Sequence, residues 1–176
     1  MPTKFFSSLV QGATAAFTEE PAKANFVFEC KTDLASGCMC VNTARHHSTI
    51  IDEPPELGGT DKGMNPVESV LAALASCRVI TYQYHAGRLG VPLKSISVRL
   101  SGEIDLRGFL AMDDTIRPGF KSITGEATID TDASAEQVKA LNEAVAKYCP
   151  VADTVSNITS LACTTRVVSA NAVAAE

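Results

Sequence analysis

The sequence predicts an α+β fold in which antiparallel sheets lie around two long central helices. Two long segments have the helical spacing of apolar residues, and each opens with a side-chain capping pattern. Two runs of alternating apolar and polar residues lie between these segments and have the pattern of antiparallel neighbours. Further strand-like runs lie before the first helix and after the second. This order argues against a doubly wound parallel sheet.

Composition limits the class of protein. The chain has 176 residues, 45% of them hydrophobic, which predicts one domain over residues 1–176 with a substantial core. A formal net charge of −5 and scattered Lys and Arg residues argue against a nucleic-acid partner. No apolar run approaches the roughly 20 residues that span a bilayer, and the N-terminus lacks a secretory signal pattern. We therefore expect a cytoplasmic protein without a membrane partner.

The shorter elements are predicted from alternation and turn residues. Residues 3–17 favour a short helix, and residues 24–32 and 37–51 have the rough alternation of strands. Residues 51–66 contain adjacent prolines and a glycine pair, which predict a long loop without regular structure. Residues 93–109 predict one strand or two, residues 120–132 an antiparallel partner, and residues 158–168 a final strand.

The first long helix has the clearest pattern in the chain. Asn65 is a suitable N-cap, Pro66 suits the first helical position, and Glu68 completes a capping pattern. At about 100° per residue, Cys77 shares one apolar face with Val67, Val70, Leu71 and Leu74. Arg78 falls on the edge of this face, so its charge needs a partner.

The second long helix, residues 134–149, opens with a Ser134–Gln137 capping box. It ends at Cys149, because the residue before a proline disfavours helical geometry. Pro150 also makes the backbone beneath the Cys149 thiol stiff. A rigidly placed thiol is suited to resolving an oxidised cysteine elsewhere in the fold.

Cys77 and Cys149 are either packing residues or a redox pair. A disulfide framework is typical of small secreted domains, so burial is the simpler interpretation of each of the six cysteines. A reactive Cys77 needs a cation or a hydrogen-bond donor from elsewhere, since it lies about 18 Å from the N-terminus of its helix. Glu68 lies on the opposite side of that helix, about 13.5 Å away. It either only caps the helix or also meets reactive groups that another chain supplies.

A metal site is the alternative use of cysteine in this chain. Cys38, Cys40, His46 and His47 offer atoms that zinc accepts as ligands. Their spacing is not that of a zinc knuckle, and packing or solvent exposure explains them as well. We therefore expect no metal.

Two stretches together resemble the OsmC/Ohr family of organic hydroperoxide reductases. They are GGTDKGMNPVESVLAALASC, which ends at Cys77, and CPVADT, which begins at Cys149. The resemblance covers roughly residues 40–165. It implies an OsmC-like fold, an intertwined homodimer with two active sites at the subunit interface, and no metal or bound organic cofactor.

The same resemblance assigns roles to four residues. Cys77 corresponds to the peroxidatic thiolate, which reduces an organic hydroperoxide and becomes a sulfenic acid, and Cys149 to the resolving thiol, which then forms a disulfide with it. Arg45 is the candidate for the arginine that stabilises the thiolate, and Glu68 for the glutamate of the site. The peroxidases place that glutamate directly after the Asn-Pro pair, where this chain has Val67. The reductant implied is a dithiol or a lipoyl-type compound, and the implied role is antioxidant defence in oxidative stress.

Two other functions stay open at this point. An OsmC-like protein that binds a small apolar ligand without catalysis has no need of Cys149. A thiol-based redox sensor keeps both cysteines but turns over slowly.

Overall fold

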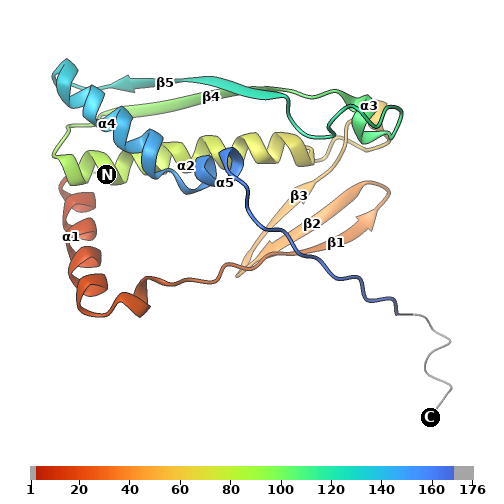
Figure 1. Ribbon diagram of the computed structural model, residues 1–176, viewed down its shortest axis with the longest axis horizontal. Coiled ribbons are helices and arrows are strands. Elements are labelled where there is room, and N and C mark those ends of the chain that lie inside the picture. Colours follow the sequence, from red (N-terminus) through yellow and green to blue (C-terminus); the bar gives the residue numbers. More distant parts are fainter. Residues whose placement is uncertain (1–2, 169–176) are drawn as a thin grey trace, which may run out of the picture.

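The computed structural model describes residues 3–168 and has one long helix, α2, as its axis (Figure 1). The helices are α1 (Thr3–Glu19), α2 (Pro66–Leu89), α3 (Leu106–Phe109), α4 (Ala135–Tyr148) and α5 (Pro150–Ser156), with 3₁₀ turns η1 (Pro21–Ala24) and η2 (Pro55–Leu57). The strands are β1 (Lys31–Ser36), β2 (Met39–Ala44), β3 (His47–Ile51), β4 (Ser95–Glu103) and β5 (Ser122–Asp130). Both sheets are antiparallel, which confirms the predicted α+β class.

Helix α2 begins and ends where the sequence predicts. The Asn65 side chain accepts a hydrogen bond from the N–H of Glu68 at 2.8 Å, and the Glu68 carboxylate accepts one from the N–H of Asn65 at 2.9 Å. Gly90 ends the helix at φ 68°, a left-handed conformation that glycine adopts without steric cost. The 24 residues between these caps extend about 36 Å, so this helix sets the length of the fold.

The loop that leads into α2 is held together by the buried Asp52. Its carboxylate accepts hydrogen bonds from the hydroxyl and the N–H of Thr60 and from the N–H of Lys62. The Thr60 hydroxyl contributes most to lowering the pKa of Asp52, and burial opposes this shift. The loop also contains the short turn η2, where no regular structure was expected. These contacts fix the chain just before the N-cap of α2.

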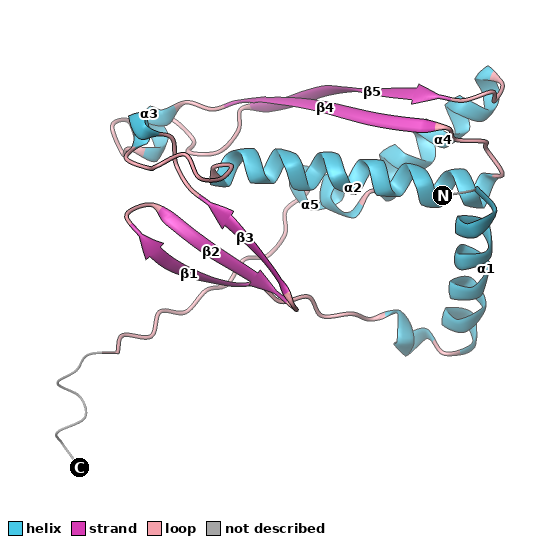
Figure 2. Ribbon diagram, turned by 180° about the vertical axis from the view of Figure 1, so that it is seen from behind, coloured by secondary structure: helices cyan, strands magenta, loops and turns pink. Residues whose placement is uncertain are grey.

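The two sheets have different surroundings. Strands β4 and β5 pair in one continuous register from Ser95↔Asp130 to Glu103↔Ser122 and lie along α2. Alternate residues of β4 are half-buried against that helix and the others are exposed. Strands β1, β2 and β3 form a separate three-stranded sheet, seen from behind in Figure 2, with most side chains of β1 and β3 exposed.

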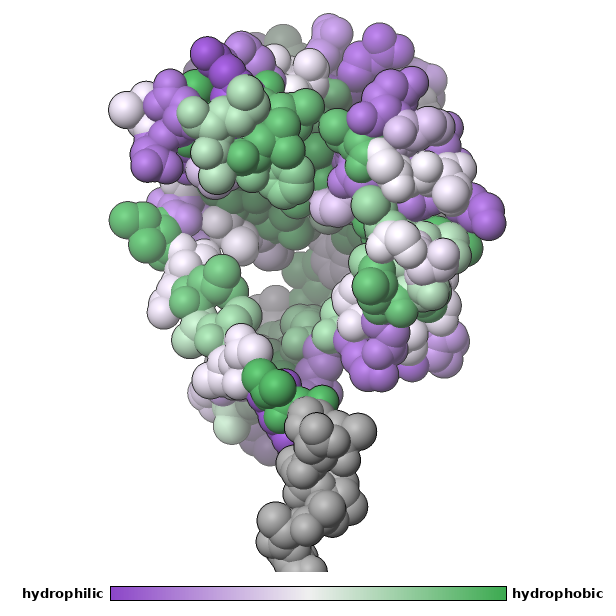
Figure 3. Space-filling view, turned by 90° about the vertical axis from the view of Figure 1, so that its right-hand side faces the viewer, coloured by the Kyte–Doolittle hydropathy of each residue, from purple (hydrophilic) through white to green (hydrophobic). Residues whose placement is uncertain are grey.

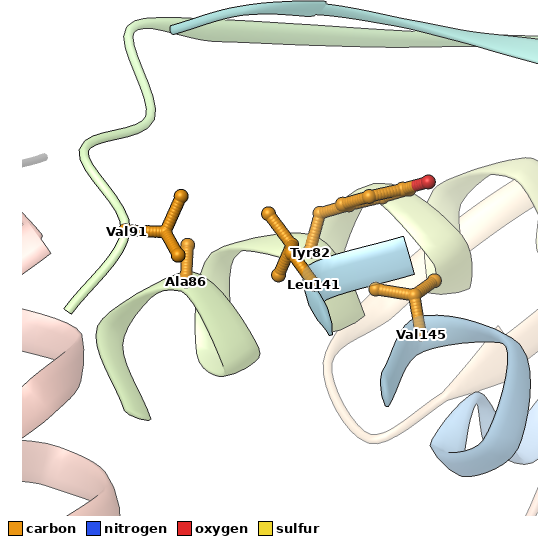
Figure 4. Close-up of a cluster of buried hydrophobic side chains, with 5 residues drawn as sticks. All are labelled: Tyr82, Ala86, Val91, Leu141 and Val145. Carbon is orange, nitrogen blue, oxygen red and sulfur yellow. The ribbon is translucent and has the colours of Figure 1, made fainter. Parts of the chain in front are cut away.

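The buried core lies between the C-terminal half of α2 and α4. Figure 4 shows Tyr82 and Ala86 of α2 beside Leu141 and Val145 of α4, with Val91 closing the end of the cluster. The Tyr82 hydroxyl donates to the amide oxygen of Asn142 at 2.8 Å, so its polar end is satisfied within the core. This packing fixes α4 against α2 and therefore fixes the position of the residue at the end of α4.

Helix α1 confirms the predicted N-terminal helix and packs against the last turns of α2. The contact is close at Gly87, where a Cβ atom would lie 2.6 Å from the Cβ of Phe6 and 2.7 Å from the N of Ser7. The Phe6 ring lies 5.3 Å from the ring of Tyr84. Glycine at this position therefore allows two helix backbones to approach.

Three strand predictions differ from the structure. Residues 25–30 are extended but unpaired, so the first strand begins only at Lys31. Residues 158–168 do not form the predicted final strand, and their apolar side chains are exposed, Ile158 fully. The end of the run 93–109 forms α3 with Asp105 as its N-cap, in place of a second strand. A strand requires a hydrogen-bonded neighbour, and residues 3–168 supply none for the first two segments.

Two further features concern the outer surface. None of the helices in residues 3–168 is both long and apolar enough to cross a membrane. Seen from the right of Figure 1, the space-filling surface has an opening through the molecule, bordered partly by hydrophobic side chains (Figure 3).

Candidate active site

The structure brings Cys77 and Cys149 together from positions 72 residues apart in the chain. Cys77 lies in the middle of α2, and Cys149 lies at the junction of α4 and α5. Their Sγ atoms are 3.5 Å apart, with the Cys149 thiol as donor, and both cysteines are free. A disulfide bond is about 2.05 Å long, so an approach of roughly 1.5 Å would join them.

The two thiols differ in access to solvent. Cys77 is half-buried, whereas Cys149 is buried with 1% of its surface exposed. A reagent from solvent therefore reaches Cys77 first. Cys149 is placed to react with whatever forms on the sulfur of Cys77.

The position of Cys149 follows from a helix junction that the sequence predicted only in part. Cys149 ends α4 with φ −76° and ψ 111°, and its N–H donates to the carbonyl of Val145. Pro150 does not terminate helical structure here, because it is the first residue of the seven-residue helix α5. Proline is favoured at that position, where its missing N–H costs nothing. This preference was the available signal for α5.

Both α5 and α2 bring polar groups near the Cys77 thiol. Burial raises the pKa of the Cys77 thiol, and the neighbouring Cys149 thiol raises it further. The backbone N–H of Val151 and the hydroxyl of Thr81 both lower it. The raising effects are larger, so the pKa of Cys77 lies above the ordinary thiol value. A thiolate at neutral pH therefore requires a further positive charge.

The other two predicted site residues are not part of this contact. Glu68 forms the capping box of α2, on the opposite side of that helix from Cys77. Arg45 lies exposed in the turn between β2 and β3 at φ 57°. Within residues 3–168, no hydrogen bond or ion pair joins Arg45 to another side chain. Both roles stay predictions that involve a second chain.

The remaining cysteines and histidines do not gather around a centre. The Sγ of Cys38 lies 4.0 Å from the carbonyl oxygen of Leu57, and the rings of His46 and His47 lie 3.9 Å apart where the β2–β3 turn meets β3. In the described part of the chain, no group of three or more His, Cys, Asp or Glu side chains could hold a metal ion. The Cys77–Cys149 pair is therefore the candidate reactive centre of the described residues.

Comparison with known proteins agrees with this geometry. The family model described as "OsmC-like protein" matches residues 59–164, a range that includes both thiols. No match was found among curated proteins. Several solved structures share the fold.

An OsmC-like protein from Mycoplasma pneumoniae is 17% identical over 76% of this chain and 90% of its own, with a TM-score of 0.66. A putative osmotic stress induced and detoxification response protein from Psychrobacter arcticus is 14% identical over 74% and 89%, with a TM-score of 0.60. An organic hydroperoxide resistance protein OsmC from Legionella pneumophila is 20% identical over 74% and 89%, with a TM-score of 0.56. At these identities the likeness concerns the fold. Because the family model matches more than half of the 176 residues, the chain belongs to the OsmC-like protein family.

Proposed function

We propose that this protein is a thiol peroxidase that reduces organic hydroperoxides in the cytoplasm through Cys77 and Cys149. The proposal rests on the 3.5 Å separation of the half-buried Sγ of Cys77 from the buried Sγ of Cys149. The family contains relatives described as organic hydroperoxide resistance proteins. One of them, from Vibrio cholerae, has captopril bound in one of its active sites.

The proposed cycle has three balanced steps. The Cys77 thiolate attacks the outer oxygen of ROOH, the O–O bond breaks, and the alkoxide takes a proton to leave as ROH while Cys77 becomes a sulfenic acid. The Cys149 sulfur then attacks the sulfenic sulfur, which releases water and forms the disulfide. A dithiol reductant, such as a lipoyl-type compound, reduces the disulfide and is itself oxidised. Two electrons pass from the dithiol to the peroxide.

A homodimer completes this proposal. The extended residues 25–30 and 157–168 expose apolar side chains such as Val27 and Ile158 and have no strand partner within residues 3–168. A second copy of the chain can supply that partner. Its Arg45 would add the positive charge that Cys77 needs, and its approach to Glu68 would give that carboxylate a role beyond the cap. Sedimentation of a monomer at working concentration contradicts this part.

The decisive experiment follows the thiols after one equivalent of cumene hydroperoxide. In the wild type we expect a Cys77–Cys149 disulfide within seconds, identified by peptide mapping and a mass loss of two hydrogens. In Cys149→Ser we expect a sulfenic acid on Cys77 that dimedone traps. The exposed Cys163 offers a matched control, since Cys163→Ser leaves the pair intact. Unmodified thiols, or oxidation that is unaffected by Cys77→Ser, contradict the peroxidase and favour a binding protein.

A further inference from the structure

A cavity lies between α2, the β4–β5 sheet and α5, and neither Cys77 nor Cys149 lines it. Its volume is about 260 Å³. Its apolar lining comes from Leu74 of α2, Val98 and Leu100 of β4, Ile123 and Ala127 of β5, and Ala152 and Val155 of α5, and Thr124 and Ser156 add uncharged polar groups. Gly125 also lines the cavity and pairs with Leu100, whose Cδ2 would lie 2.5 Å from a Cβ at position 125, so the glycine accommodates the Leu100 side chain. The proposed thiol chemistry does not use this cavity.

Arg78 of α2 is one of the two charged residues that line the cavity. Glu126 also lines it, but side chains of β5 point alternately to the two faces of the sheet. The half-buried residues on the face toward α2 are Ile123, Ala127 and Ile129. Glu126 is exposed and pairs in register with the exposed Arg99 on the outer face of the sheet. Only its backbone therefore borders the cavity.

The guanidinium of Arg78 has no carboxylate partner within residues 3–168. It is half-buried and lies close enough to the Tyr82 hydroxyl to lower the pKa of that group, although burial is the larger effect and raises it. Tyr82 is itself fixed by its hydrogen bond to Asn142 of α4. The fold thus places a half-buried guanidinium, without a carboxylate partner in the described residues, at a partly apolar cavity, where a bound anion would pair with it.

We propose that this cavity binds a small carboxylate with an apolar chain, with Arg78 as the counter-ion. An arginine presents a planar pair of N–H donors that matches a carboxylate, and the aliphatic walls suit an alkyl chain. The volume of about 260 Å³ equals roughly nine water molecules at about 30 Å³ each. A ligand of about ten non-hydrogen atoms, such as an eight-carbon carboxylate, is therefore of matching size. This inference goes beyond the proposed peroxidase and does not require it.

Octanoate and 1-octanol test the proposal, because they share the chain and differ in charge. Binding is measured by isothermal titration calorimetry on the Cys77→Ser protein, so that thiol oxidation cannot contribute. We expect octanoate to bind roughly tenfold to a hundredfold more tightly than 1-octanol, the range for a hydrogen-bonded ion pair that is partly shielded from water. Arg78→Met, which keeps the length of the side chain, should reduce octanoate binding to the level of the alcohol.

Arg99→Met is the matched control, because it removes the same charge from the outer face of the sheet that borders the cavity. It should bind octanoate like the parent protein, and circular dichroism establishes that each variant is folded. Equal binding of octanoate and 1-octanol, no binding of either, or unchanged octanoate binding by Arg78→Met overturns the proposal. The proposal is also overturned if the parent protein binds no octanoate and Arg78→Met changes it from a dimer to a monomer. The Arg78 charge would then belong to a contact with a second copy. The peroxide experiment uses the intact thiols, so either proposal can fail alone.

Discussion

Oxidation of Cys77 and Cys149 to a disulfide should make the native protein markedly more stable. The bond would close a loop of 72 residues, which lowers the entropy of the unfolded chain. In the chain-entropy model this is worth about 4.4 kcal/mol at 25 °C. The Sγ atoms are already 3.5 Å apart and need move only roughly 1.5 Å, so we expect little strain to offset the gain. For a chain of this size the melting temperature should rise by roughly 9–18 °C.

The measurement is urea unfolding of the oxidised and reduced protein at one concentration, followed by circular dichroism. Cys77→Ser, treated with the same oxidant and reductant, is the control for oxidation of the exposed cysteines. Its two curves should coincide. An oxidised wild type that is no more stable than the reduced form would refute the view that the fold holds the two thiols ready for bond formation.

Further expectations concern the core, the α1 contact, the thiol pKa and the site of movement. Leu141→Ala removes a fully buried side chain and should cost about 3 kcal/mol in urea unfolding, whereas Leu34→Ala at an exposed position of β1 should change stability by less than about 0.5 kcal/mol. Gly87→Ala forces a Cβ to 2.6 Å from that of Phe6, so limited proteolysis should cut α1 faster. Burial raises the pKa of Cys77 within the single chain, and the proposed approach of Arg45 from a second copy lowers it. Alkylation by iodoacetamide should therefore reach its plateau at a higher pH in Arg45→Met than in the wild type, and equal pH profiles would show that Arg45 does not act on Cys77. On oxidation, hydrogen exchange should change in α5 and stay constant in the middle of α2.

Local signals predicted the helices well. The capping boxes at Asn65 and Ser134 form as the sequence indicates, and both involve residues three positions apart. The strand predicted at residues 158–168 does not form, because alternation alone predicted it and residues 3–168 supply no hydrogen-bonded neighbour for it. A short-range pattern gives the preference of a segment, and tertiary neighbours decide whether a sheet forms.

Local sequence signals predict the Cys77–Cys149 site less completely than they predict the helices. Spacing alone left Cys77 and Cys149 open between packing and chemistry, and the resemblance to a family supplied the pair. Nothing in the sequence indicated that the N–H of Val151 acts on Cys77, since this contact depends on α5 beginning at Pro150 and on α4 packing against α2. Arg78 was recognised as a charge that needs a partner, but its cavity exists only where α2, α5 and the sheet meet.

The arrangement of the two thiols also indicates which one moves when they join. Cys77 lies in the middle of a 24-residue helix that packs against α1, α4, α5 and β4, so displacing it would disturb most of the core. Cys149 lies where two helices meet, and α5 after it has seven residues and is followed by residues 157–168, which form no helix or strand. The movement of roughly 1.5 Å toward disulfide length therefore costs least at the α4–α5 junction. That movement would carry with it the N–H of Val151 and the α5 wall of the Arg78 cavity, so the redox state of the thiols and the shape of the cavity are expected to be linked.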